Sequence, residues 1–330
     1  MKRVSIAVCT VLLVFSVFLT ASVTTARAEV YPDRDIRWVI GGAAGGGFDV
    51  YARAIGRSME KYLPKGVHVI IDNKPGAGHR IAMSAVYNAK PDGYTMGMPH
   101  QPGLFIDQMY GKQTYDMTKV TWLAMILHDT RLMCVSSKSK YKTFDELRKA
   151  QNVRIAINGF ASELDVVVAH NRLGFQAEYI AGHTSSNDAA LAVMRGDADG
   201  LAFAPASLRE LVRDKHLIPL AVYGAEKRLP EYPNLPTLAE LGQPALNEVV
   251  GTFRSIAGPP NMPPDRVKTL RDIIGKALTD KEFLDTMAKA GREVEYKNGE
   301  ETVKIMSNLM KGYEALKEEL RPFIEKEKKK

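Results

Sequence analysis

The chain has 330 residues, 45% of them hydrophobic and 25% charged, and the 302 residues that follow residue 28 suit two globular domains, each with an ample core. The formal net charge of +7 falls to +4 without residues 1–28, because Lys2, Arg3 and Arg27 lie there with no acidic residue. This mild positive charge argues against a nucleic-acid partner, and with Cys134 alone left beyond residue 28, no intrachain disulfide is possible.

The N-terminus has the pattern of a secretory signal peptide. Lys2 and Arg3 precede an apolar stretch over residues 4–21, and Ala26-Arg27-Ala28 supplies the small residues of a cleavage site. We therefore predict that residues 1–28 direct export and are cleaved after Ala28. The alternative is an uncleaved membrane anchor, because the apolar stretch is close to the length that spans a bilayer.

From Asp35 onward, strand and helix patterns alternate. Strands are predicted at 36–40, 67–71 and 94–98, with helices at 49–63 and 81–88 between them. This order implies a parallel sheet. A similar α/β pattern fills the middle of the chain, with strands at 153–157, 177–180, 200–204 and 219–223 and helices at 163–173 and 187–195. Helices at 264–278, 281–290 and 301–320 complete it.

Two long extended segments, near 122–135 and 249–257, bracket the middle of the chain. This arrangement is typical of a chain that crosses to a second lobe and returns. We predict one lobe from residues 29–126 together with 252–330, and a second lobe from residues 127–251. Because neither crossing is rich in Gly or Ser, ordered strands should join the lobes and act as a hinge.

Residues 41–47, Gly-Gly-Ala-Ala-Gly-Gly-Gly, join the first predicted strand to the first predicted helix. Glycine permits backbone angles and close approaches that a side chain would block. A glycine-rich turn before a helix also directs free N–H groups and the positive end of the helix dipole at one point. The sequence therefore predicts an anion-binding loop.

Enzyme motifs are incomplete in this chain. Asp72 lies where a dinucleotide-binding fold places its ribose-binding carboxylate, but Gly45 and Gly47 are followed by Val50 instead of a third glycine. The sequence contains no Gly-x-Ser-x-Gly, no His-Glu-x-x-His and no Cys/His cluster at zinc spacing. The motifs therefore predict no catalytic residues, metal or cofactor, and a secreted Rossmann-like enzyme is kept as the enzyme hypothesis.

Several short motifs occur in a characteristic order. They are Tyr31-Pro32, Ala44-Gly45-Gly46-Gly47-Phe48-Asp49, Asn73-Lys74-Pro75-Gly76-Ala77-Gly78, Pro91-Asp92-Gly93-Tyr94-Thr95, Ala225-Glu226-Lys227-Arg228, Pro233-Asn234-Leu235-Pro236-Thr237-Leu238 and Ala257-Gly258-Pro259. Together they resemble the substrate-binding family of tripartite tricarboxylate transporters, often called Bug-type receptors. The resemblance extends over the whole chain after the predicted signal peptide.

This resemblance implies an α/β, two-lobe periplasmic-binding-protein fold of type II (Venus flytrap). Each lobe would be a mostly parallel sheet flanked by helices, with the two crossing strands as hinge. It further implies a monomeric periplasmic receptor that captures a small organic anion, usually a carboxylate, and delivers it to a tripartite tricarboxylate-type membrane permease. In such receptors loop N–H groups and bridging waters hold the carboxylate.

The chain departs from the family pattern where the ligand would be selected. Gly41-Gly42-Ala43 lacks the usual proline, Phe48 replaces Ser or Thr, and His79-Arg80 replace Gly-Asn. Phe160-Ala161-Ser162-Glu163 replaces a loop of Gly, Ser and Thr, and His183 replaces Tyr. The usual ligands of the family therefore transfer poorly to this chain.

The predicted ligand-binding residues come from loops that follow strands in both lobes. They are Ala44, Gly45, Gly46, Gly47, Phe48, Gly76, Ala77, Gly78, His79, Arg80, His100, Asn158, Phe160, Ser162, His183, Thr184, Ser185 and Ser186. Arg80 would bind a carboxylate bidentately. Glu163 would instead receive an ammonium group, which leaves an amino acid as the alternative ligand. Asp49 is expected mainly to cap its helix.

Overall fold

The computed structural model describes residues 31–111, 113–158, 163–183 and 185–327 of the chain. The predicted signal peptide and three predicted site residues, Phe160, Ser162 and Thr184, lie outside these ranges. Among the helices of the described ranges, none is both long and apolar enough to cross a membrane.

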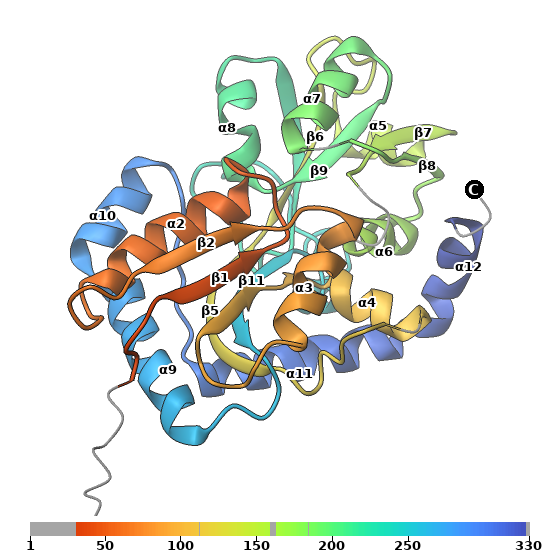
Figure 1. Cartoon of the computed structure of the whole chain (residues 1–330). Helices are drawn as coiled ribbons and strands as arrows, with labels where there is room; N and C mark the ends of the chain where they lie inside the picture. Colours follow the sequence, from red (N-terminus) through yellow and green to blue (C-terminus); the bar gives the residue numbers. More distant parts are fainter. Residues whose placement is uncertain (1–30, 112, 159–162, 184, 328–330) are drawn as a thin grey trace, which may run out of the picture. The chain divides into compact units, whose positions relative to one another are not determined.

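The first sheet combines strands from both ends of the chain (Figure 1). Its strands are β1 (Ile36–Ile40), β2 (Val69–Asn73), β3 (Thr95–Met98), β4 (His100–Gln101), β5 (Thr121–Asp129) and β11 (Thr252–Gly258). Strands β2 and β3 flank β1 in parallel, as the sequence predicted, and β11 is antiparallel to β3, β4 and β5. The antiparallel pairs arise because the crossing strands join the sheet, which the βαβ pattern does not indicate.

Helices from both ends of the chain pack around this sheet. The helices are α2 (Gly47–Glu60), η1 (Ala77–His79), α3 (Arg80–Tyr87), α4 (Gly103–Tyr110), α9 (Pro264–Thr279), α10 (Lys281–Lys289), α11 (Gly299–Ala315) and α12 (Lys317–Glu327). Helix α2 packs against α9 and α10, and α4 packs against α11. Helix α4 was not predicted, because its buried run Leu104-Phe105-Ile106 shows no helical period. The helix predicted at 301–320 is interrupted at Leu316, where α11 ends.

The second sheet has the strand order β10-β6-β9-β7-β8. Its strands are β6 (Arg131–Ser136), β7 (Val153–Ala156), β8 (Ala177–Ile180), β9 (Gly200–Phe203) and β10 (Leu217–Tyr223). Its helices are α5 (Phe144–Lys149), α6 (Leu164–Leu173), α7 (Ser186–Arg195) and α8 (Pro205–Arg213), with η2 (Pro244–Glu248) before the return crossing. Strands β8 and β9 flank β7 in parallel, and β6 is antiparallel to β9 and β10.

Successive side chains of β6 point alternately into two hydrophobic clusters, one on each face of the sheet. Leu132 and Cys134 pack in one cluster with α7 and α8, whereas Met133 and Val135 pack in another with α5 and α6. Successive side chains of a strand point to opposite faces, so a strand buried on both faces is apolar at nearly every position. The chain therefore has a two-lobe α/β fold, with one sheet in each lobe.

A buried ion pair lies where the chain first passes between the sheets. Arg131 begins β6 and binds Asp165 of α6 bidentately, with Nη2 donating to Oδ1 at 2.8 Å. The Arg131 and Asp165 side chains are 3% and 0% exposed. The amide of Gly251, just before the returning strand β11, donates to Asp165 Oδ2 at 2.9 Å. One carboxylate thus joins both crossings to α6.

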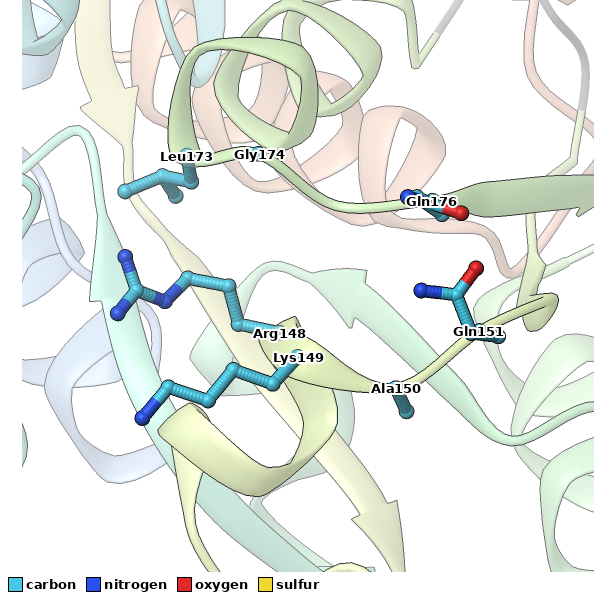
Figure 2. Close-up of a pocket in the computed structure, with 7 residues that line it drawn as sticks. All are labelled: Arg148, Lys149, Ala150, Gln151, Leu173, Gly174 and Gln176. Atoms are coloured by element: carbon cyan, nitrogen blue, oxygen red, sulfur yellow. The ribbon is translucent and has the colours of Figure 1, made fainter.

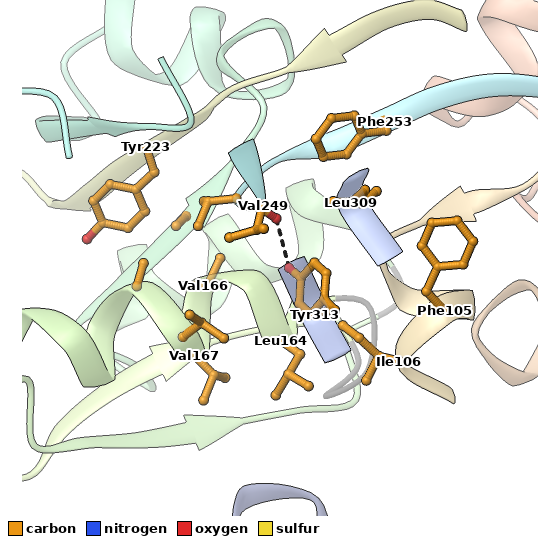
Figure 3. Close-up of a cluster of buried hydrophobic side chains, with 14 of the residues drawn as sticks. Phe105, Ile106, Leu164, Val166, Val167, Tyr223, Val249, Phe253, Leu309 and Tyr313 are labelled. Carbon is orange, nitrogen blue, oxygen red and sulfur yellow. Dashed lines mark hydrogen bonds between the residues drawn. The ribbon is translucent and has the colours of Figure 1, made fainter. Parts of the chain in front are cut away.

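Helix α11 adds a second attachment at the return crossing. The hydroxyl of Tyr313, which is fully buried, donates to the carbonyl oxygen of Val249 at 2.8 Å (Figure 3). Figure 3 shows the surrounding apolar side chains, among them Leu164 of α6, Phe105 of α4 and Phe253 of β11. The C-terminal part of the chain therefore packs on elements of both sheets.

Replacing Asp165 with Ala should lower the free energy of unfolding by about 3–5 kcal/mol, because it leaves Arg131 as a buried charge without its carboxylate. Urea titration followed by circular dichroism measures this change. Asp285→Ala, which removes an exposed ion pair with Lys281, is the control and should change little. A similar small effect for Asp165→Ala would contradict the role assigned to the crossing.

His170 of α6 is fully buried in an aromatic cluster. Its ring stacks on Phe175 at 4.3 Å between centroids, and the Tyr179 hydroxyl lies 3.3 Å from Nδ1. Burial disfavours the charged imidazolium and lowers the pKa of His170 to about 3. The unfolded chain protonates this histidine near pH 6.5, so its contribution to stability is present above that pH and is lost progressively as the pH falls.

We expect this loss to amount to about 1.4 kcal/mol of unfolding free energy per pH unit below about pH 6. Urea titrations of the parent chain and of His170→Gln measure the contribution of His170 to the pH dependence of stability. Glutamine does not titrate, and all other titratable groups are common to both proteins. The stability advantage of the parent over the variant should shrink from pH 6 to pH 4.5. A constant difference would show that His170 is not held neutral.

Candidate functional site

The glycine-rich loop after β1 is organised by Asp49 of α2. Asp49 is 3% exposed, and its carboxylate accepts from the Gly45 amide at 2.9 Å and from Asn73 Nδ2 at 3.0 Å. Arg53 Nε donates to the same carboxylate at 2.9 Å. Asn73 Nδ2 also donates to the Gly42 carbonyl oxygen at 2.9 Å, which ties the loop to the end of β2. Asp49 therefore holds the loop before the helix, instead of capping the first-turn amides of α2 as the sequence predicted.

Two of the loop amides are already bonded. The Gly45 amide donates to Asp49, and the Gly46 amide donates to the Ala43 carbonyl oxygen at 3.1 Å. The amides of Gly47 and Phe48 belong to the first turn of α2, where N–H groups have no acceptor within the helix. The best backbone donors for an anion are therefore the amides of Gly47 and Phe48, not those of Gly45 and Gly46.

A second turn lies beside this loop, at the end of the neighbouring strand β2. Gly76, Ala77, Gly78 and His79 all have positive φ, at 118°, 47°, 59° and 71°. Left-handed angles at Ala77 and His79 cost energy because the Cβ atom crowds the backbone. Such local strain is often found at binding sites. The two turns lie side by side at the carboxyl ends of the parallel strands β1 and β2.

His79 fits beneath the loop only because Gly41 has no side chain. A Cβ atom at Gly41 would lie 2.5 Å from His79 Cγ and Nδ1. His79, His100 and Phe48 form a three-ring cluster with centroid separations of 4.8, 4.9 and 5.4 Å. Sequence reasoning named all three residues as ligand contacts, and the fold brings them together.

Both imidazoles in this cluster are held neutral at neutral pH. Burial, assisted by the charge of Arg254, lowers the pKa of His79 to about 4. Burial also lowers the pKa of His100 well below its usual value, and the charges of His79, Arg131 and Arg254 add to this. Nδ1 of each ring is buried and has no hydrogen-bond partner among the described residues.

Arg254 of β11 is the functional candidate that sequence reasoning missed. It is 6% exposed, its Nε donates to Asp129 Oδ2, and its Cζ lies 4.6 Å from the Phe48 ring centroid. A Cβ atom on Gly47 would lie 3.4 Å from Arg254 Nη2, so the guanidinium lies directly against the first turn of α2. The signal available in the sequence was that Arg254 is the one charged residue of the predicted strand 249–257.

The remaining predicted residues have mixed surroundings. Ala44, Gly45, Gly76, Ala77, Gly78, Arg80 and Ser185 are exposed, whereas Gly46, Gly47, Phe48, His79, Asn158, His183 and Ser186 are partly exposed and His100 is buried. Arg80 donates to the Ala77 carbonyl oxygen at 2.8 Å and lies 3.7 Å from Asp107. Ser185 caps α7 by accepting from the Asp188 amide at 3.1 Å. Asn158 Oδ1 and His183 Nε2 are buried without a partner among the described residues.

The cavity in Figure 2 lies elsewhere. Its volume is about 300 Å³, and it is lined by Arg148, Lys149, Ala150, Gln151, Leu173, Gly174 and Gln176 at the ends of α5 and α6. None of these is a predicted ligand-binding residue. Within the described ranges, no group of three or more His, Cys, Asp and Glu residues is placed to hold a metal ion.

Comparison with known proteins shows which family and which solved structures this chain resembles. The family model TctC, described as "Tripartite tricarboxylate transporter family receptor", matches residues 51–321. A Cupriavidus necator protein named "UPF0065 protein in gbd 5'region" is 27% identical over 310 residues, 92% of each chain.

Solved structures share the fold. A TctC solute-binding protein from Polaromonas, without ligand, superposes with a TM-score of 0.70 at 26% identity, over 88% of this chain and all of the other. MatC from Rhodopseudomonas palustris, with bound malate, has a TM-score of 0.72 at 22% identity, over 86% of this chain and 98% of the other.

Replacing Gly41 with Ala should lower the free energy of unfolding by about 1–3 kcal/mol, because the new methyl group overlaps the His79 ring. Thermal and urea denaturation measure the loss. The His79→Ala variant lacks the overlapping ring, so adding Gly41→Ala to it should lower the free energy of unfolding by less than Gly41→Ala does in the parent chain. An equal loss of stability in the two backgrounds would mean that Gly41 is not needed to make room for the His79 ring.

Proposed function

Because this chain belongs to the tripartite tricarboxylate transporter receptor family, a family of periplasmic solute-binding proteins, we propose that it captures a small organic acid and passes it to a membrane permease of the same transport system. The ligand would bind between the lobes, with the first lobe supplying residues 44–48 and 76–80. Asn158, His183, Ser185 and Ser186 would approach from the second lobe.

The observation that carries this proposal is the pair of turns at the carboxyl ends of strands β1 and β2. The loop before α2 and the turn before α3 follow the parallel neighbours β1 and β2, and Asn73 at the end of β2 donates to Gly42 of the loop and to Asp49 of α2. Ligands of parallel α/β sheets bind at the carboxyl ends of the strands. The free amides of the first turn of α2 favour an anion there. Malate in MatC is one such anion, bound by a protein of this fold.

The position of Glu163 favours an acid over an amino acid as ligand. Glu163 is 3% exposed, and its charge lies close enough to Arg131 to stabilise that cation. An ammonium group of a ligand would have to compete with Arg131 for this carboxylate. An amino-acid ligand is therefore the weaker alternative, and no feature of the described site favours a nucleotide.

The remaining expectations form part of the same proposal. Residues 1–28 would be the cleaved signal peptide that takes the chain to the periplasm, and the receptor would act as a monomer without a cofactor. The lobes would comprise residues 29–126 with 252–330, and 127–251, and would move about the two crossings.

A thermal-shift screen of residues 29–330 tests the function. Binding of a ligand to the native state raises the melting temperature by mass action, so one or more monocarboxylates, dicarboxylates, tricarboxylates or aromatic carboxylates should stabilise the protein. NAD and nucleotides serve as the enzyme control and should have no effect. Stabilisation by nucleotides alone would contradict the proposal.

Replacing Gly46 with Val should weaken binding of the stabilising acid by at least about tenfold, or about 1.4 kcal/mol. A Cβ atom at this position would already lie 3.0 Å from the Ala43 carbonyl oxygen, and larger branches block the approach of an anion to the α2 amides. Calorimetric titration measures the affinity, and circular dichroism checks that the fold is kept. Unchanged affinity in a folded variant would exclude the loop as the anion site.

A further inference from the structure

We propose that Arg254 directly binds the carboxylate of the ligand, and that the charges around it select an acid with a single negative charge. This inference rests on the proposed function, since it assumes that an organic acid is captured at the loop before α2. It adds the residue that carries the charge recognition and the charge class of the ligand.

Arg254 has unused hydrogen-bonding capacity in a buried position. Its Nε is bonded to Asp129, but its Nη1 is buried and has no partner among the described residues. A buried donor without an acceptor is costly, so such groups in native proteins usually meet a ligand, an ion or water. A guanidinium can engage a second carboxylate with the N–H groups that the first leaves unused.

The guanidinium faces the predicted anion loop. It lies against Gly47, where a Cβ atom would be 3.4 Å from Nη2 and 3.7 Å from Nη1, and its Cζ lies 4.6 Å from the Phe48 ring centroid. The open amides of the first turn of α2 belong to the same residues. A carboxylate at Nη1 would therefore lie within reach of both the cation and the helix N-terminus.

His100 and Arg254 are placed together by strand pairing. They are directly opposite each other in the antiparallel pair of β4 and β11, so their side chains lie on the same face of the sheet. The His100 and His79 rings each carry a buried Nδ1 without a described partner. Three side chains with buried nitrogens of unused capacity, from three different elements, thus surround the Phe48 ring.

Charges around this point are close to balanced before any ligand binds. Asp129 neutralises Arg254, and the Asp49 carboxylate is bonded to Arg53. The two imidazoles add hydrogen-bonding atoms but no positive charge, because both are held neutral.

The more distant charges add no unpaired cation to this region. Arg80 lies 3.7 Å from Asp107, and Glu163, buried near Arg131, adds a further negative charge. A second or third ligand carboxylate would have to compete for Arg53, Arg80 or Arg131, each of which already has a carboxylate partner, and unpaired buried charge is strongly unfavourable.

Calorimetric titration with hexanoate and benzoate as monoanions, adipate as dianion and citrate as trianion tests the inference. A monoanion should bind the parent chain at least about tenfold more tightly than adipate or citrate, or about 1.4 kcal/mol. The double variant Arg254→Gln with Asp129→Asn replaces the ion pair by a neutral pair of similar shape, so it should fold yet lose at least about tenfold of that affinity. Arg172→Gln with Glu319→Gln, a remote ion pair, is the matched control and should bind as the parent does.

Asp129→Asn alone gives a result of opposite sign. It keeps Arg254 and removes the carboxylate that competes with the ligand, so affinity for every acid should rise, most of all for adipate and citrate. Unchanged monoanion binding by the double variant, or tightest binding of adipate or citrate by the parent, would overturn the inference and leave the proposed function standing. Failure of the parent chain to bind any acid would overturn the proposed function, and the inference with it.

Discussion

The two-lobe arrangement depends on how the chain is fixed where it crosses between the sheets. Thr130 separates β5 from β6, and the residues on either side of it each form a buried ion pair. Arg131 binds Asp165 at the start of α6, and Asp129 binds Arg254 on the returning strand. Gly251 donates to Asp165 as well. These directional bonds define both crossings, whereas apolar packing alone would leave them free to slide.

The crossings and the candidate site share residues, so ligand binding would affect the contacts that hold the crossing strands together. Asp129 and Arg254 hold the two crossing strands together, and Arg254 also lies against Gly47 and Phe48. Any anion that attracts Arg254 competes with Asp129 and changes the contacts at a crossing. Ligand charge and lobe position would then influence each other through one guanidinium.

Buried polar groups give the site its chemical character. Desolvation keeps His79 and His100 neutral, so they act as hydrogen-bonding rings and not as cations. Asp49 is used inside the loop, where it occupies the Gly45 amide. Counting Arg, His, Asp and Glu in the loops would therefore overestimate the positive charge that a ligand meets.

The sequence alone determined the βαβ order, the position of the glycine-rich loop at 41–47 between β1 and α2, and the family, because these depend on local periodicity and short motifs. It also named His79, His100 and Phe48, which the fold brings together. It did not reveal helix α4, the antiparallel strand pairs or the role of Arg254. Those depend on partners far apart in the chain: Arg254 meets Asp129 and Gly47 only once β11 has returned to the first sheet. Local pattern carries no record of such pairings, so only the tertiary structure decided them.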